Sequence, residues 1–403
     1  GYDMDVVSSY LDSYKVRMIA LRDGNLENTA GAVAAASRLD SIDLLSVFGD
    51  QDIAAYIRSR AAGSIAVIGG LYFSQRSSIA NLPQIILVEL LSQLLAKDYT
   101  YVVYHPCDEA GLSPDILKAV EKQGFINIAP KGARPIFAVD MRSPVIVFKN
   151  VDTVIKHPLN KNRAVLAAVE KAHDKMLSML TSIYPGELII SYNSGIMYHK
   201  IINLIARINK VSPLPYAEKS YGKYMAVPFG KLLEGSAVPN TVTKSMHTEK
   251  YFYRDVSDFT IEEKSYYSTL ENQVRTIKSF NRPVILVDDL LHKGYRMNEI
   301  DPILKSNDVE VVETVVGVQT GRGRDLMTIK ERTVDSAYFL PNLKCWIDES
   351  DMYPYIGGDS MKDADVAVES QSAIPSLNLL LPFAVPTFLG NISGQNLYDY
   401  SMT

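Results

Sequence analysis

One stretch of the chain decides its expected fold: Val284-Ile285-Leu286-Val287-Asp288-Asp289-Leu290-Leu291-His292-Lys293-Gly294-Tyr295-Arg296. Its first four residues are apolar, as in a strand buried on both faces of a parallel sheet. Two adjacent acids, Asp288 and Asp289, end this strand, and a short loop with Gly294 leads into a helix predicted over 297–305. Ligands of open α/β sheets bind outside the carboxyl ends of the strands. We therefore expect a binding site where the acids meet the loop.

The residue types of this stretch favour a sugar phosphate as the ligand. Carboxylates accept hydrogen bonds from sugar hydroxyls, and backbone N–H groups in a glycine loop that opens a helix bind anions. His292, Lys293 and Arg296 add positive charge to the loop. The alternative interpretation is a strand end with capping acids, followed by a solvated basic turn.

The same order of elements continues on both sides of this stretch. Strands are predicted at 187–191, 224–227 and 311–318, and helices at 201–208 and 297–305. Strand, turn and helix thus repeat, which indicates a doubly wound parallel sheet in the C-terminal part of the chain.

The N-terminal part also alternates apolar strands with amphipathic helices. Strands are predicted at 64–68, 101–104 and 125–128, and a core helix at 84–96. Ser113 and Pro114 together predict a helix start, and Gly124 the stop of that helix. We expect an α/β protein of two domains, residues 1–150 and 151–403.

Composition and charge narrow the class of protein. The chain has 403 residues, 46 acidic and 41 basic side chains, 47% hydrophobic and 22% charged residues. These values exclude disordered and fibrous classes, and the net charge of −5 argues against a dedicated nucleic-acid binder. Two cysteines cannot form a disulfide framework, which favours the cytoplasm.

One uncharged stretch raises the question of a membrane. Residues 370–398 are long enough to cross a bilayer, but they contain Pro375, Pro382 and Pro386. Prolines there would leave backbone groups unsatisfied in lipid. We therefore expect a buried or capping C-terminal segment and no membrane partner.

The thirteen-residue stretch resembles the phosphoribosyl-pyrophosphate signature of type I phosphoribosyltransferases. It has the family's four apolar residues, two acids, two apolar residues and short phosphate loop with glycine. The resemblance extends in element order over residues 180–360. It implies a phosphoribosyltransferase-like domain that binds phosphoribosyl pyrophosphate or another ribose phosphate, with Mg²⁺ held through the pyrophosphate, and transfers the phosphoribosyl group to an unidentified base. A homodimer is left open, and no side chain is assigned as a metal ligand.

The resemblance also assigns roles to individual residues. It implies that Asp288 and Asp289 bind the ribose hydroxyls, and that a closing loop supplies Lys244, with His247 and Lys250, to the leaving pyrophosphate. We accordingly treat Asp288, Asp289 and Lys244 as the candidate catalytic residues. The candidate substrate-binding residues are His292, Lys293, Gly294, Tyr295 and Arg296 for the phosphate, and Asn193, Ser194 and Gly195 for the pyrophosphate.

Departures from the family pattern define a first alternative. The family's phosphate loop usually carries threonines or serines where this chain has His292, Lys293 and Tyr295. Some family members keep the fold and bind the ligand only as regulators. The first alternative is therefore a non-catalytic protein that senses a phosphoribosyl ligand.

The N-terminal part defines a second alternative. Residues 15–130 resemble acetyltransferases of the GNAT kind in element order, although 74–81 lack the glycines of that family's coenzyme A loop. This resemblance implies an acetyltransferase-like domain, either degenerate or active as an acyl-coenzyme A dependent acyltransferase.

Several other polar residues are candidates for the ligand site or for a metal site. Lys231, after the strand at 224–227, is expected near the site. Arg322 and Arg324 form either an anion-binding turn or a surface loop. The acids within 348–351 are metal-ligand candidates without a calcium-loop spacing. His173 has no metal-ligand spacing and is interpreted as a surface or satisfied core histidine.

Overall fold

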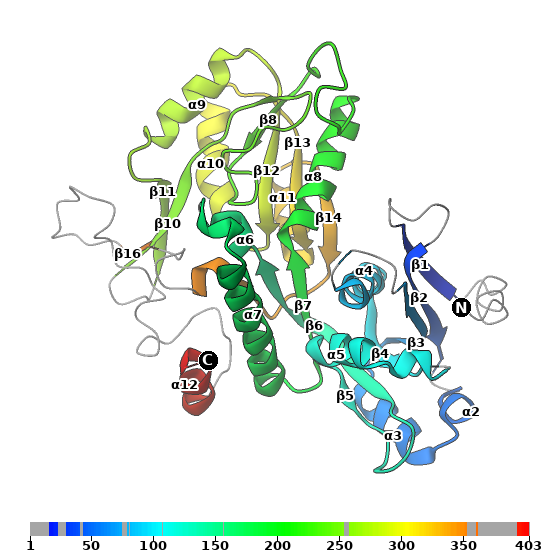
Figure 1. Cartoon of the computed structure of the whole chain (residues 1–403). Coiled ribbons are helices and arrows are strands. Elements are labelled where there is room, and N and C mark those ends of the chain that lie inside the picture. The colour runs from blue at the N-terminus through cyan, green and yellow to red at the C-terminus, as the bar shows by residue number, and fades with distance from the viewer. Residues whose placement is uncertain are drawn as a thin grey trace.

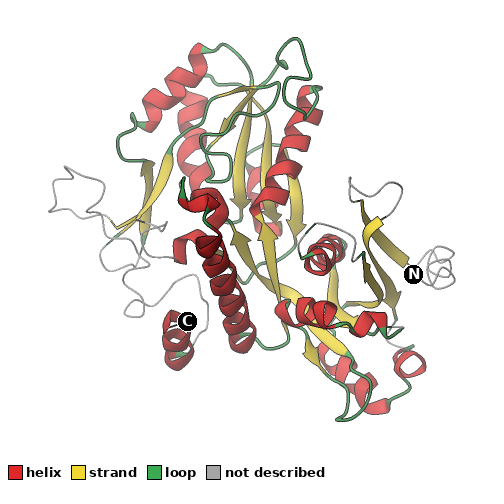
Figure 2. Ribbon diagram, viewed as in Figure 1, coloured by secondary structure: helices red, strands yellow, loops and turns green. Residues whose placement is uncertain are grey.

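The computed structural model describes residues 16–22, 30–40, 43–74, 79, 81–106, 108–155, 157–253, 258–352, 360–361 and 393–402. Within these residues the protein is mixed α/β, with one large mixed sheet, one parallel sheet and one small sheet (Figures 1 and 2). No helix in this part of the chain is long and apolar enough to cross a membrane.

The C-terminal sheet, sheet B, has five parallel strands in the order β14-β13-β12-β8-β9. The strands are β8 (Met225–Pro228), β9 (Val242–Thr243), β12 (Val284–Leu291), β13 (Val311–Thr320) and β14 (Val334–Leu340). The acid pair therefore lies on the central strand, and the expected parallel sheet is confirmed.

Helices cover both faces of sheet B because its strands are apolar on both sides. Ile285 and Val287 pack with α8 (Ser194–Asn209). Val284 and Leu286 point the other way and pack with α9 (Leu270–Ser279) and α10 (Tyr295–Ser306). Figure 1 shows α8 and α10 on opposite sides of β12. Burial on both faces fixes the register that presents Asp288 and Asp289 at the strand's end.

The large sheet, sheet A, has eight strands. They are β1 (Val16–Arg22), β2 (Ala30–Leu39), β3 (Ser64–Phe73), β4 (Tyr99–Tyr104), β5 (Ile126–Asn127), β6 (Phe137–Lys149), β7 (Glu187–Asn193) and β15 (Cys345–Asp348). Strands β1 to β3 are antiparallel neighbours, whereas β3 and β4 run parallel.

Strand β6 is the centre of sheet A, since its 13 residues pair with four other strands. Its first half pairs antiparallel with β4 and β5. Its second half, Val145 to Phe148, lies between β7 and β15, both parallel to it. The predicted boundary near residue 150 thus falls between β6 and β7, which are neighbours in one sheet.

The strand predicted at 187–191 forms, but it joins a different sheet from the one that we expected. We expected it in the C-terminal parallel sheet, and the structure places it as β7 in sheet A. The physical reason is the apolar run Val145 to Phe148, which offers β7 a parallel partner inside the core.

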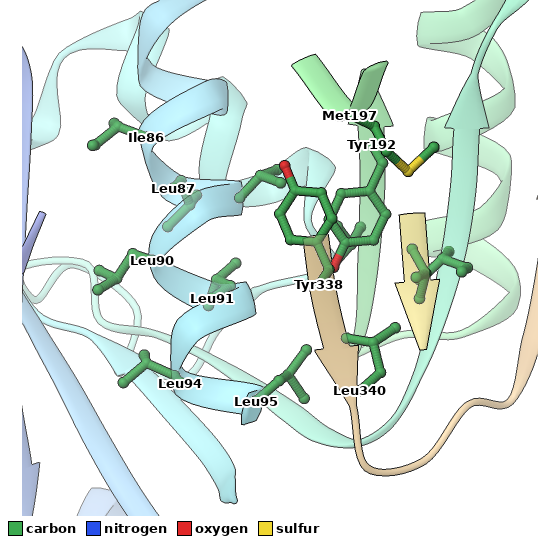
Figure 3. Packing of buried hydrophobic residues seen from close by; sticks show 14 of the residues in the cluster. Ile86, Leu87, Leu90, Leu91, Leu94, Leu95, Tyr192, Met197, Tyr338 and Leu340 are labelled. Carbon is green, nitrogen blue, oxygen red and sulfur yellow. The ribbon is translucent and has the colours of Figure 1, made fainter. Parts of the chain in front are cut away.

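Helix α4 (Leu82–Ala96) lies between the two large sheets and is buried on nearly every side. Its leucines contact sheet A, and its middle part, at Glu89 and Ser92, reaches Tyr338 of β14 and Tyr192 of β7 (Figure 3). Helix α7 (Arg163–Ile183) packs on the opposite face of β6 and β7 through Leu177 and Leu180. The remaining helices are α2 (Leu44–Phe48), α3 (Gln51–Arg60), α5 (Pro114–Lys122), α6 (Val151–Val154), α11 (Gly321–Ile329) and α12 (Gly394–Met402), with 3-10 turns η1 (Ala110–Leu112), η2 (Leu159–Lys161) and η3 (Glu349–Met352).

A small third sheet lies beside the start of α10 (Figure 1). Strand β10 (Thr248–Phe252) pairs antiparallel with β11 (Phe259–Glu263) and parallel with β16 (Ser360–Met361). The expected capping segment, residues 370–398, lies outside the described residues except for 393–398, which belong to the chain end carrying α12.

Candidate functional site

The candidate site lies at the carboxyl edge of sheet B, where the loops after β8, β12 and β13 meet. Both acids lie in the second half of strand β12. Val287, just before them, pairs with Pro228, the last residue of β8. Leu291 pairs with Gln319 near the end of β13. The three loops that follow therefore start side by side.

Asp288 is buried and paired with a cation. The residue is 4% exposed, and its carboxylate accepts a hydrogen bond from Arg296 Nη1 at 2.8 Å. Its Oδ1 also accepts from the backbone N–H of Asp289 at 2.9 Å. Burial raises the pKa of Asp288, against the opposing effect of the Arg296 charge. The sequence assigned Arg296 to phosphate, whereas the structure shows it bound to this acid.

Asp289 is held by the loop that follows β8. Its two carboxylate oxygens accept from the backbone N–H of Leu232, at 3.1 and 3.2 Å. Burial, and secondly the neighbouring charge of Asp288, raise its pKa to about 6. Asp289 can therefore exchange a proton near neutral pH. A carboxylate accepts about four hydrogen bonds, so acceptor capacity remains for a ligand.

Gly230 allows this close approach, and sequence reasoning missed it. A Cβ built on Gly230 would lie 2.6 Å from Asp289 Oδ1 and 2.7 Å from Asp288 Oδ1. Any larger residue would collide with the acids. The signal available in the sequence was a glycine two residues after a buried strand.

Lys231, the next residue, turns to a different set of acids. Its Nζ donates to Asp351 at 2.8 and 2.7 Å and lies 3.4 Å from Asp348. The charge of Asp348 also acts on Asp288 and Arg296. Asp348, at the end of β15, and Asp351, in η3, thus lie beside the candidate site of sheet B.

The predicted phosphate loop adopts the expected loop-to-helix form. Gly294 has a left-handed φ of +69°, and helix α10 begins at Tyr295 with no side-chain cap. His292 Nδ1 is hydrogen-bonded to Thr320 Oγ1 at 3.0 Å. Burial first, then the charges of Lys293 and Arg322, lower the pKa of His292. Two cations, Lys293 and Arg322, thus lie near His292 in the loop that precedes α10.

The arginine turn after β13 is helical. Residues Gly321–Ile329 form α11, with Thr320 as N-cap accepting from Gly323 N–H. The effect of Arg322 on His292 shows that this helix start adds charge to the same edge.

The polar stretch expected to close over the site forms the β10–β11 hairpin. Phe259 of β11 meets Tyr295 edge-on with ring centroids 4.9 Å apart. Lys250 Nζ lies over the Phe259 ring at 4.4 Å, and His247 Nδ1 donates to Glu234 at 3.0 Å. Lys244 follows β9 and donates its backbone N–H to Ala226. Within the described residues, none of these three basic side chains contacts the acid pair.

The predicted pyrophosphate turn follows β7, a strand of sheet A, and opens helix α8. Asn193 ends β7 and caps α8 by accepting from Ile196 N–H at 3.0 Å, while Ser194 Oγ donates to Lys149 O at 2.8 Å. Their interactions are those of a helix start. Gly195 is the second residue of α8, and the assignment of Asn193, Ser194 and Gly195 to pyrophosphate stays a prediction.

A metal site made by the protein alone is not apparent in the described part of the chain, where no three His, Cys, Asp or Glu side chains are grouped to hold an ion. Comparison with known proteins gave no further assignment, since no family model and no curated protein matches the chain. The geometry itself offers carboxylate acceptors, backbone N–H groups and positive charge at one sheet edge.

Proposed function

We propose that the carboxyl edge of sheet B binds a phosphorylated ribose, and that the chain is a phosphoribosyltransferase-like protein. One observation carries the proposal. The carboxylates near the end of β12 and the start of α10, which has no side-chain cap, are joined by one short loop, residues 292–294. Asp289 is placed to accept from ribose hydroxyls, and the N–H groups at the start of α10 to bind the phosphate.

The electrostatics of the edge support this ligand. Arg296 neutralises Asp288. The acid pair therefore repels an incoming anion less than two unpaired carboxylates would. Lys293 and Arg322 lie close enough to His292 to lower its pKa. A phosphate near this loop would meet cations on one side and a helix dipole on the other.

Phosphoribosyl transfer is the reaction we propose for this site, with phosphoribosyl pyrophosphate as donor. Loss of pyrophosphate from the ribose leaves a cationic centre that anionic neighbours stabilise. We assign Asp289 to this role, because its carboxylate is held by backbone N–H groups and keeps acceptor capacity for a ligand. Mg²⁺ would enter with the pyrophosphate of the ligand and neutralise it there.

Ligand-dependent stabilisation tests the binding site. Ribose 5-phosphate and phosphoribosyl pyrophosphate, with and without Mg²⁺, should raise the melting temperature, and a ligand at 100 times its Kd adds about 2.7 kcal/mol. Asp289→Asn should remove most of this gain. The matched control is Asp335→Asn, because Asp335 lies at the start of β14, at the opposite edge of the same sheet. An equal gain in both variants would reject the site.

Product analysis separates the proposed reaction from the alternatives. Release of pyrophosphate in the presence of a base identifies a transferase. Stabilisation without release under any base identifies a regulatory binding protein. Stabilisation by acetyl-coenzyme A alone would instead support the acyltransferase that the N-terminal resemblance implies.

A further inference from the structure

A second cluster of reactive groups lies in sheet A, on the face of β7 that is covered by α7. His173 of α7 is 2% exposed, and its Nδ1 lies 2.7 Å from Glu349 Oε2. Its other ring nitrogen, Nε2, lies 3.3 Å from Ser191 Oγ. Glu349 is fully buried. Serine, histidine and carboxylate are thus connected in one line through the two nitrogens of a single ring.

The order of atoms in this line is the one that nucleophilic catalysis requires. The buried carboxylate fixes the proton on Nδ1, which leaves Nε2 to accept from the serine hydroxyl. A histidine held in this tautomer can take the serine proton as Oγ attacks an electrophile. Three residues from three separate elements, α7, β7 and η3, meet to build it.

Ser191 also faces a space that can hold a substrate. It lines a pocket of about 340 Å³ at the carboxyl ends of β6 and β7. The pocket has apolar walls, formed by Ile85 and Val88 of α4, Leu166 and Val169 of α7, and Ile196 of α8. A short acyl chain fits such walls, because burial of each CH₂ contributes roughly 0.8 kcal/mol.

Polar groups are present at the same pocket for the developing oxyanion. Asn193 lies two residues beyond Ser191 on the same strand face and lines the pocket. Its Oδ1 is engaged by Ile196 N–H, so its amide NH₂ is the end that can donate to a ligand. The ion pair of Lys149 with Glu170 also lines the pocket.

We propose that Ser191, His173 and Glu349 form a serine acyl-hydrolase site that cleaves small esters with an apolar acyl group. Ser191 Oγ attacks the ester carbonyl carbon while its proton passes to His173 Nε2. The C–O bond to the alcohol breaks, and the alcohol leaves with that proton. Water then attacks the acyl-serine, losing a proton to Nε2, and the acid leaves as Ser191 regains its proton. Glu349 is a positioning residue.

Covalent labelling tests this site on the full chain. A small dialkyl fluorophosphonate should form one adduct on Ser191, with loss of fluoride, and peptide mass spectrometry locates it. The chain should also hydrolyse p-nitrophenyl acetate. Ser191→Ala should abolish both. Ser92→Ala is the matched control and should keep both, because Ser92 is another buried serine whose partners are Val88 O and Tyr192 OH.

Variants of His173 and Glu349 test whether these two residues activate Ser191. His173→Gln should slow labelling by about 100-fold or more. Glu349→Gln should slow it strongly and remove the low-field proton resonance of His173 Nδ1–H, whereas Glu349→Asp should restore part of the rate. Absence of a Ser191 adduct in the folded wild-type chain, or equal labelling in unfolded chain, would overturn the proposal. Stabilisation by ribose 5-phosphate should persist in Ser191→Ala, because Ser191 is not among the residues assigned to the sugar-phosphate site.

Discussion

Arg296 donates to Asp288 across 2.8 Å, and the two side chains are only 24% and 5% exposed. The first acid of the pair is therefore compensated within its own loop and helix. Asp289, by contrast, is bound only by backbone N–H groups among the contacts found in the described residues. The two adjacent carboxylates consequently have different tasks: Asp288 anchors α10, and Asp289 is the acid that a ligand can use.

Loss of Arg296 should destabilise the fold through Asp288. Arg296→Met leaves a buried carboxylate without its cation, which costs about 3 kcal/mol. Urea unfolding at neutral pH measures the loss. Asp288→Asn in the same chain should recover most of it. The control is Arg275→Met, which breaks an exposed pair with Glu271 and should change stability by less than about 0.5 kcal/mol.

Asp289 should make stability fall as pH rises. Its folded-state pKa is about 6, above its ordinary value of 3.8, so the folded chain holds this proton more tightly than the unfolded chain does. The contribution is full below about pH 4 and is lost as the pH passes through about 6. Asp289→Asn should flatten this slope and stabilise the chain at pH 8 by about 1–2 kcal/mol. An unchanged slope in urea titrations would contradict the assignment.

Binding of inorganic phosphate should raise the pKa of His292. Burial and the charges of Lys293 and Arg322 now lower it, and an anion in the loop offsets those charges. Titration of the imidazole resonances with and without phosphate gives the shift. His199 serves as the internal control, since it is exposed on α8 and its resonance should not respond to phosphate.

Gly294→Ala should cost more than a left-handed backbone alone explains. Its Cβ would lie 2.0 Å from Leu326 Cδ2, so the Leu326 side chain on α11 would have to leave its present position. Gly49 has a similar φ, +64° against +69°, but open space around its Cβ position. We expect Gly49→Ala to cost about 1 kcal/mol and Gly294→Ala at least about 1–3 kcal/mol more. Equal losses in thermal unfolding would show that packing is not the cause.

The local pattern of apolar residues and glycines was sufficient to predict most helices and strands. The strand at 284–287, the helix now seen as Tyr295–Ser306 and the core helix now seen as Leu82–Ala96 were all predictable, because apolar periodicity and glycine placement act within a few residues. The place of β7 was not predictable. Its partner depends on β6, and a strand carries no local mark of which parallel edge it will join.

The candidate sites, too, were predictable only where their residues are neighbours in the sequence. Asp288 and Asp289 were visible as a motif, whereas the bond from Arg296 and the approach of Gly230 depend on loops from separate strands. His173 lies 18 residues before Ser191 and 176 residues before Glu349 in the sequence. No spacing rule joins them, and only the pairing of β15 with β6 brings Glu349 to His173.

Strand β6 ties the two parts of the sequence into one cooperative unit. A cut after residue 150 would strip the run Val145 to Phe148 of its partners on both sides, since β7 and β15 would be on the other fragment. Each fragment made alone would then carry a bare apolar edge prone to self-association. Co-expressed, the two would complete each other, so this chain is suited to fragment complementation rather than to exchange of whole modules.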